Sequence, residues 1–349
     1  MQKIGIVTLF GLYNYGNRLQ NYAVQEIFQK YGFQCDTLIS SECTPRNILK
    51  QIKEIVTHGN LRIIKSYLFN KKYLSIRVQK NHALLFSETI NNDYEYFVVG
   101  SDQVWNPEIR KNQRKNFFLQ FAEKNKRLTL SPSIAVSSIP DEYKQTFSEG
   151  FNGFNHISVR EINSVPLVED LTKVPVTHLI DPTLALTRVE WEKIEKAVSL
   201  PNKYVVSLFL GNTNNDKLRS IIKKYSDEGY HIIDFSKWKW HSMGPDEFIY
   251  IIHHSSLVCT DSFHCLVFSI LFERPFYAFN RHSGKDSIDV TDNMSSRIDS
   301  LLTLFEIPKE IVSGIGSLAM PTIDYKRVND ILISERKRLY DFVELELGY

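Results

Sequence analysis

The sequence lacks the features that mark several large classes of protein. Its four cysteines, Cys35, Cys43, Cys259 and Cys265, form no CxxC pair and no disulfide-framework spacing, which favours a reducing compartment. No apolar run approaches the roughly 20 residues needed to span a bilayer. The amino-terminal stretch MQKIGIVTLFG has no signal-peptide architecture. We therefore expect a cytoplasmic protein without an integral membrane segment.

Nucleotide and metal motifs are also missing. The chain contains neither G-x-G-x-x-G nor G-x-x-x-x-G-K-[ST], which disfavours a nicotinamide dehydrogenase and a P-loop NTPase. His253 and His254 are adjacent, and neighbouring side chains on a helix point in different directions. We expect them to be a solvated pair at a helix end, and we expect no metal. The chain also has no basic reading motif, so we expect no nucleic-acid partner.

Charge is unevenly distributed along the 349 residues, although the net charge is only +2. The segment from Arg46 to Lys80 holds nine Lys or Arg residues and a single acid, Glu54. Basic residues alternate there with aromatic and aliphatic ones, which is compatible with peripheral contact with an anionic inner membrane surface. The alternative is a helical insertion whose lysines simply face solvent.

Short apolar strand patterns alternate with helical patterns, which indicates parallel α/β architecture. In the first half we expect strands at 3–9, 33–39, 94–100, 127–131, 156–159 and 176–180, and helices at 17–31 and 140–151. The second half repeats this rhythm, with strands at 204–211, 231–236, 257–260 and 274–279 and helices at 215–229, 245–254 and 263–272. A long helix is expected at 328–347.

This pattern predicts two Rossmann-like domains. The N-terminal domain covers 1–183 and contains a basic helical insertion at about 45–88. The C-terminal domain covers 184–325, and the segment 326–349 is a helix that packs back on the N-terminal domain. Ligands of open α/β sheets bind beyond the carboxyl ends of the strands. The residues to consider therefore lie at 14–20, 100–105, 160–161 and 261–264.

The stretch TDSFH places three polar side chains between two apolar runs. Thr260, Asp261 and Ser262 can each cap a helix that begins near Phe263. A helix amino terminus also binds anions through its free N–H groups and dipole. His264, in the first turn, could then donate to a phosphate or move a proton.

Arg160 follows the expected strand at 156–159 and carries a planar guanidinium that suits a carboxylate or a phosphate. The alternative is a surface ion pair with Glu161 or Asp170. The turn Gly100–Asp102 ends another strand, where glycine permits close approach of a ligand; the alternative there is an ordinary helix cap.

Four stretches together resemble the polysaccharide pyruvyl transferase family. They are LYNYGNRLQNYAVQ (12–25), FVVGSDQVWNP (97–107), SVRE with DPTLALTRVEW (158–161 and 181–191), and TDSFHCLVFSILFERPF (260–276). Their order and spacing match the family across roughly residues 3–305. The family pattern usually reads DSFHG, and here Cys265 replaces the glycine.

The resemblance implies a glycosyltransferase-B-like fold, in which two Rossmann-like domains face a cleft. It also implies transfer of the pyruvate unit of phosphoenolpyruvate to a sugar diol, which forms a ketal in cell-surface polysaccharide biosynthesis. Phosphoenolpyruvate is then a co-substrate, and no further cofactor is expected. The sugar acceptor could be a lipid-linked oligosaccharide.

The same resemblance assigns roles to residues. His264 and Asp102 are the expected catalytic residues, as proton donor and hydroxyl base. Phosphoenolpyruvate is expected to bind mainly on the side of the C-terminal domain and to contact Arg160, Ser262, Phe263, His264 and Arg297. The acceptor is expected to contact Asn14, Asn17, Gln20, Ser101 and Asp102 on the N-terminal side. Two other functions fit the same pattern: a glycosyltransferase that uses a nucleotide sugar, and a non-catalytic glycan- or phosphate-binding protein.

Overall fold

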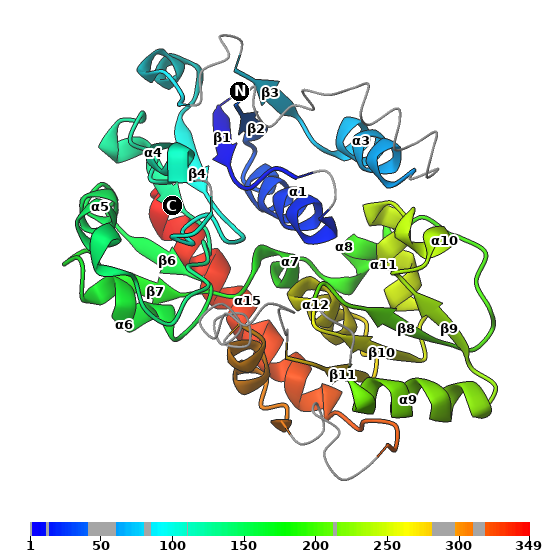
Figure 1. The fold of residues 1–349 in the computed structure, drawn as a ribbon. Coiled ribbons are helices and arrows are strands. Elements are labelled where there is room, and N and C mark those ends of the chain that lie inside the picture. Colours follow the sequence, from blue (N-terminus) through cyan, green and yellow to red (C-terminus); the bar gives the residue numbers. More distant parts are fainter. Residues whose placement is uncertain are drawn as a thin grey trace. The chain divides into compact units, whose positions relative to one another are not determined.

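The structure is a computed structural model that describes residues 2–11, 14–40, 61–79, 85–109, 111–211, 215–280, 297–309 and 318–349. The chain divides into two compact units. Unit 1 is built from the ranges 1–54, 66–186 and 335–349, and unit 2 from 55–65 and 187–334. Figure 1 labels the elements of both.

Unit 1 contains a five-stranded parallel sheet in the order β3-β2-β1-β4-β5. The first part of the chain forms, in order, β1 (Lys3–Val7), α1 (Tyr15–Gln29), β2 (Gln34–Ile39), α3 (Arg62–Tyr73), β3 (Ile76–Val78), η2 (Glu88–Asp93), β4 (Tyr96–Val99), η3 (Lys111–Gln113), α4 (Arg114–Phe117), η4 (Lys124–Lys126) and β5 (Arg127–Thr129). The central strands are buried on both faces, as helix-covered parallel strands must be.

A second, two-stranded parallel sheet completes unit 1. It follows α5 (Asp141–Phe151) and consists of β6 (Ile157–Val159) and β7 (Val176–His178), with α6 (Ser164–Glu169) between them and α7 (Pro182–Ala185) after them. An aromatic cluster packs against the apolar side chains of β6. The Trp105 indole packs edge to face on Phe151 at 5.1 Å between ring centroids, and its N–H donates to the Phe117 carbonyl at 2.9 Å. The buried indole is therefore both packed and hydrogen-bonded.

Unit 2 contains a four-stranded parallel sheet in the order β11-β10-β8-β9. Its elements are α8 (Arg188–Glu192), β8 (Tyr204–Leu208), α9 (Asp216–Asp227), β9 (His231–Asp234), α10 (Trp238–His241), α11 (Pro245–His253), β10 (Leu257–Thr260), α12 (Phe263–Leu271) and β11 (Phe276–Ala278). In Figure 1, α9 lies on one face of this sheet and α12 on the other. The connections β8–α9–β9 and β10–α12–β11 run in opposite directions across the sheet, so right-handed crossovers place α9 and α12 on opposite faces.

Each of the two larger sheets has a topological switch point, where successive connections leave in opposite directions. It lies between β1 and β4 in unit 1 and between β8 and β10 in unit 2. Ligands of open α/β sheets bind beside such points. The loops after these four strands are therefore the places to look for function.

The last helix, α15 (Tyr325–Leu347), supplies residues to unit 1 through its second half. Arg336 donates to the carbonyls of Leu184 and Leu186, at 2.8 and 2.9 Å, and Arg338 donates to the His178 carbonyl at 3.2 Å. These arginines thus provide hydrogen bonds to carbonyl oxygens at the last residue of β7 and in and directly after α7.

The predicted pattern of alternating strands and helices is confirmed, including the four strands and three long helices of unit 2. The prediction missed β3, a three-residue strand within the expected basic insertion. It lies at the sheet edge and carries Arg77 between two apolar residues, as short charged edge strands do, and so gives almost no periodic signal. The rest of that insertion, at 41–60 and 80–84, lies outside the described residues.

The expected membrane contact of the insertion stays a prediction. On α3, Tyr67 is 61% exposed and Leu68 is 55% exposed, close to Lys71 and Lys72. Among the described residues, no helix is both long and apolar enough to cross a membrane.

Unit 2 contains a buried carboxylate whose removal should be measurable. Glu247, on α11, accepts from Lys65 at 2.6 Å, from Lys196 at 2.9 Å and from the Gly244 N–H at 2.9 Å. Burial alone would raise the pKa of Glu247, but these three donors outweigh it and lower the pKa. The carboxylate therefore stabilises the fold at neutral pH.

We expect Glu247→Gln to lower the free energy of unfolding by about 2 kcal/mol at neutral pH, because charged hydrogen bonds are replaced by neutral ones. Since the folded pKa of Glu247 is depressed, this contribution is lost as the pH falls from the ordinary glutamate value through the lower folded value. Urea unfolding of the unchanged protein and of Glu247→Gln, at neutral pH and below about pH 4, measures the stability difference and its loss in acid. An equal difference between the two proteins at both pH values would contradict the ion-pair account.

Candidate functional site

In unit 1, the residues predicted from three separate stretches meet at the switch point between β1 and β4. The Gln20 amide donates to the Thr8 hydroxyl at 2.8 Å, and its carbonyl oxygen accepts from the Ser101 N–H at 2.8 Å. Thr8 in turn donates to the Ser101 carbonyl at 3.1 Å. Gln20 and Ser101 are fully buried. These hydrogen bonds join the loops after β1 and β4 into one rigid edge.

The Ser101 hydroxyl leads to a buried ion-pair network. It donates to Asp181 at 3.1 Å, and the same carboxylate oxygen accepts from Arg160 at 3.0 Å. Arg160 also donates to Glu161 at 3.0 Å, and Glu161 accepts from the Ser133 hydroxyl at 2.7 Å. Burial alone would lower the pKa of Arg160, but the surrounding carboxylates outweigh it and raise the pKa. The guanidinium is fixed as a cation between two acids.

The partners of Arg160 differ in part from those weighed in the sequence. It does pair with Glu161, but the pair is buried rather than on the surface, and the second acid is Asp181 rather than Asp170. Sequence reasoning missed Asp181 as a site residue. It directly follows the expected strand at 176–180, so the rule that selected the other strand-end residues would also have found it.

Asp102 lies at the tip of the turn after β4. Its backbone has φ 67°, a left-handed conformation that Asp tolerates better than most residues. One carboxylate oxygen accepts from the Gln103 N–H at 2.8 Å, and the other accepts from the side-chain amide of Asn17 on α1. Gly100 has φ 124°, and an added Cβ would collide with the Leu130 carbonyl, so the turn requires glycine there.

The unit 1 candidates therefore fall into two groups. Gln20, Ser101 and Arg160 are buried within the network, and their contacts shape the edge of the sheet. Asn17 and Asp102 are buried as well, but they contact each other at the turn after β4. Asn14 is exposed and caps α1, with its side-chain oxygen accepting from the Asn17 N–H at 3.4 Å.

In unit 2, the stretch TDSFH ends β10 and begins α12 at the switch point between β8 and β10. Ser262 occupies the N-cap position with extended backbone, φ −95° and ψ 122°, and its side chain makes no capping hydrogen bond. The Ser262 N–H donates to the Thr260 hydroxyl at 3.0 Å, and that hydroxyl donates to the Leu208 carbonyl at 2.6 Å. The amino terminus of α12 is therefore not closed by a side chain of its own N-cap.

Asp261 does not cap α12 either. Its two carboxylate oxygens accept from the N–H groups of Leu210 and Gly211, both at 2.8 Å. These residues follow β8, so Asp261 ties the loop after β8 to the loop after β10. The acid that the sequence offered as a helix cap instead aligns the two loops of the switch point.

His264 and Cys265 occupy the first turn of α12 in different surroundings. His264 is 8% exposed, and its ring meets the Phe263 ring edge to face at 5.3 Å. Cys265 is fully buried, and burial raises the pKa of its thiol to about 12, while a hydrogen bond with Thr260 opposes that shift. The thiol that replaces the glycine of the motif lies in the protein interior and is kept protonated.

Arg297 is the remaining cationic candidate. It lies in a helical segment that is described over 297–304, and its side chain is buried, with 6% exposure. The candidates thus gather around two switch points, with Asn17, Gln20, Ser101, Asp102 and Arg160 in unit 1, and Ser262, Phe263 and His264 in unit 2. Their predicted contacts with substrates stay predictions.

Parallel sheets whose connections reverse at a switch point place the protein in the broad class of Rossmann-like α/β proteins. The family model for polysaccharide pyruvyl transferase matches residues 14–283. The chain therefore belongs to the polysaccharide pyruvyl transferase family.

Solved structures with related topology are distant. A UDP-GlcNAc 2-epimerase from Neisseria meningitidis, bound to UDP-GlcNAc, is 11% identical with a TM-score of 0.45, covering 97% of this chain and 100% of its own. A UDP-N-acetylglucosamine 2-epimerase from Rickettsia bellii is 8% identical with a TM-score of 0.43, covering 99% and 98%. A glycosyltransferase from Rickettsia africae is 11% identical with a TM-score of 0.43, covering 99% of both chains. Comparison with curated proteins finds no match.

Proposed function

We propose that the protein transfers the pyruvate unit of phosphoenolpyruvate to two hydroxyl groups of a sugar, and so forms a pyruvate ketal in cell-surface polysaccharide biosynthesis. The observation that carries this proposal is the amino terminus of α12. It lies at the switch point of unit 2, its N-cap side chain makes no capping bond, and His264 stands in its first turn. Helix N–H groups and the helix dipole favour an anion there.

Overall, the reaction transfers two hydroxyl protons, one to the methylene carbon and one to the departing phosphate, and releases one inorganic phosphate. Protonation of the methylene carbon of phosphoenolpyruvate leaves a cationic centre at C2, which the first sugar hydroxyl attacks. The bond from C2 to the phosphate oxygen then breaks, and inorganic phosphate leaves. The second hydroxyl attacks C2 and closes the ketal, and each hydroxyl gives up its proton. The chemistry therefore needs a proton donor, a proton acceptor and stabilisation of the phosphate.

Residues of unit 2 fit the phosphate end of this reaction. In the proposal, the Ser262 hydroxyl and the N–H groups that follow it, at Phe263 and His264, bind phosphate. His264 supplies the proton, either to the methylene carbon or to the departing phosphate. Arg297 adds a positive charge. Asp261 holds the loop after β8 in place beside this site, because its two carboxylate oxygens accept from the two N–H groups of that loop.

Residues of unit 1 fit the acceptor end. Asp102 is the proposed base for a sugar hydroxyl, and the Asn17 amide that bonds to it sets its orientation. Gln20 and Ser101 hold the turn that presents Asp102. The contact of Arg160 with phosphoenolpyruvate stays a prediction. Because two acids already accept from this buried guanidinium, its surroundings favour a positioning role.

We expect phosphoenolpyruvate alone to raise the melting temperature of the protein, because a ligand that binds only the native state stabilises it. Thermal denaturation with phosphoenolpyruvate, with a nucleoside diphosphate and with inorganic phosphate measures this. Phosphate release from phosphoenolpyruvate should then depend on an added sugar acceptor, so a screen of sugars and lipid-linked oligosaccharides identifies the substrate.

The two alternative functions give different results in the same experiment. A sugar transferase would be stabilised by the nucleoside diphosphate and not by phosphoenolpyruvate. A binding protein would be stabilised by a glycan and would release no phosphate. Stabilisation by neither phosphoenolpyruvate nor phosphate would contradict the anion site at α12.

A further inference from the structure

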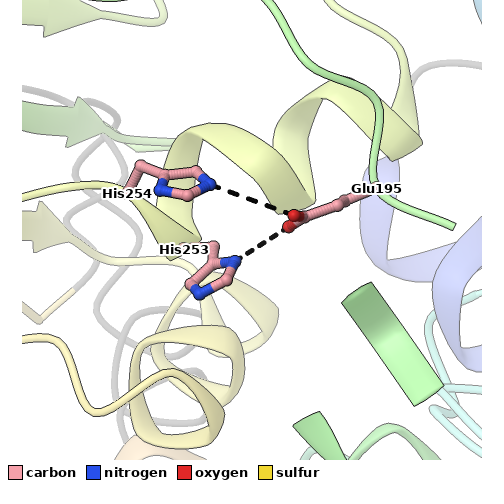
Figure 2. Close-up of side chains that lie close together, drawn as sticks. All are labelled: Glu195, His253 and His254. Atoms are coloured by element: carbon pink, nitrogen blue, oxygen red, sulfur yellow. Dashed lines mark hydrogen bonds and ion pairs between the residues drawn. The ribbon is translucent and has the colours of Figure 1, made fainter. Parts of the chain in front are cut away.

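A cluster of metal-ligating side chains lies at the other end of the unit 2 sheet. His253 is the last residue of α11, His254 is its C-cap, and both precede the amino-terminal end of β10. Glu195 follows α8 in a separate segment of the chain. Figure 2 shows both imidazole rings directed at the Glu195 carboxylate. TDSFH, by contrast, lies at the carboxyl end of β10, so this cluster takes no part in the proposed reaction.

The structure differs here from the expectation that the two histidines point apart. His254 lies just beyond the helix, with φ −95° and ψ 5°, so its ring does not continue the helical rotation. The two rings stack instead, with centroids 4.4 Å apart and an interplanar angle of 27°. His253 also stacks on Phe272 at 4.3 Å, which fixes its ring plane.

We propose that Glu195, His253 and His254 bind a divalent transition-metal ion of the zinc class. The ligands are Nδ1 of His253, Nε2 of His254 and a carboxylate oxygen of Glu195. The ion would join the segment after α8 to the carboxyl-terminal end of α11. Two imidazoles and one carboxylate are the protein ligands of one common zinc site, in which a water or another ligand takes the fourth position.

The distances suit such an ion. The three ligand atoms lie within 4.8 Å of one another. His253 Nδ1 is 2.9 Å from one Glu195 oxygen, and His254 Nε2 is 3.9 Å from the other. Zinc–ligand bonds of about 2.0–2.1 Å separate neighbouring tetrahedral ligands by roughly 3.3 Å. The first separation is shorter than that value and the second is longer, so the side chains must adjust to enclose an ion.

The surroundings also fit. Side-chain exposure is 44% at His254 and 17% at Glu195, which leaves a path for an ion from solvent. The site lies at the carboxyl-terminal end of α11, where the helix dipole favours a cation. Imidazole ligands favour zinc, nickel, cobalt and copper, whereas magnesium and calcium prefer oxygen ligands only.

The positive charge of Arg188 should weaken the binding of a metal ion, and this gives a specific test of the proposal. Its guanidinium nitrogen lies 2.8 Å from His253 Nε2 and can only donate, so Nε2 accepts and Nδ1 carries the proton in the neutral ring. Metal binding at Nδ1 moves the ring proton to Nε2, and Glu192, 3.6 Å away, would have to move closer to accept it. Removal of Arg188 should therefore strengthen metal binding. Arg274 is a second cation near His254, and it stays in place in every variant.

The experiment titrates untagged, metal-stripped protein with Zn²⁺ and with Co²⁺, and uses Mg²⁺ as the control ion. We expect roughly one Zn²⁺ per chain, a rise in melting temperature, and Co²⁺ absorption bands typical of nitrogen and oxygen ligands. Glu195→Gln and His254→Ala should each weaken binding about tenfold or more, because even outer-shell changes cost that much. Arg188→Gln should tighten it.

His231→Ala is the matched control, since it removes an exposed histidine from the same unit, at the first residue of β9. Its affinity for Zn²⁺ should equal that of the unchanged protein. Equal affinity in Glu195→Gln and His254→Ala overturns the site, as does a lack of stoichiometric binding by the unchanged protein. Weaker binding in Arg188→Gln overturns the assignment of Nδ1.

Discussion

Replacing His264 with alanine should reduce acceptor-dependent phosphate release from phosphoenolpyruvate by about 100- to 10,000-fold, the range that a positioned acid–base group contributes. The reason is the place of His264 in the first turn of α12, beside the proposed phosphate site. The measurement is steady-state phosphate release with a saturating acceptor, together with circular dichroism to show that the variant is folded.

His264→Gln separates the two roles of the imidazole. Glutamine can still donate a hydrogen bond to phosphate, but it cannot transfer a proton near neutral pH. If His264 is the acid, the glutamine variant should bind phosphoenolpyruvate and remain nearly inactive. If His264 only holds phosphate, the glutamine variant should recover much of the rate. Full turnover in the alanine variant would remove His264 from the mechanism.

Replacing Arg160 with alanine should lower the free energy of unfolding by about 3–5 kcal/mol, which is the cost of breaking a buried ion pair from one side. Asp181 and Glu161 would both lose a donor, and both are buried. The measurement is denaturant unfolding, followed by probes in each unit because the two units need not unfold together.

Two further variants test the cause of this loss. Adding Asp181→Asn and Glu161→Gln to Arg160→Ala should recover part of the stability, since the uncompensated charges are then gone. Arg327→Ala breaks an exposed ion pair with Glu306 and should change stability far less. A loss in Arg160→Ala no larger than in Arg327→Ala would show that the buried network is not a source of stability.

The positions of the strands along the chain could be predicted from the sequence, because buried parallel strands are short apolar runs with helices between them. The apolar runs of β1, β4, β8 and β10 are clear, and the polar residues directly after each of them mark the switch points. The same rule selected Ser101 and Asp102, and the stretch that ends at Gln20, as candidates, and their roles stay predictions.

Partners across long sequence separations could not be read in the same way. Nothing near TDSFH shows that Asp261 accepts from Leu210 and Gly211, because that pairing depends on the order of strands in the sheet. Likewise, His253 and His254 look like a solvated pair until the chain brings Glu195 to them. The spacing of residues along a helix predicts which side chains of that helix are neighbours. The contacts of Asp261 and of Glu195, by contrast, join different elements.

The position of α15 in the sequence has a consequence for how the protein folds while it is being synthesised. Unit 1 uses residues from both ends of the chain, and Arg336 and Arg338 emerge from the ribosome only after all of unit 2. Until then the carbonyl oxygens of His178, Leu184 and Leu186 lack these donors. The first domain to be synthesised is thus the last to be completed, although N-terminal domains usually fold first. A protein cut after residue 334 would keep unit 2 and leave unit 1 unfinished.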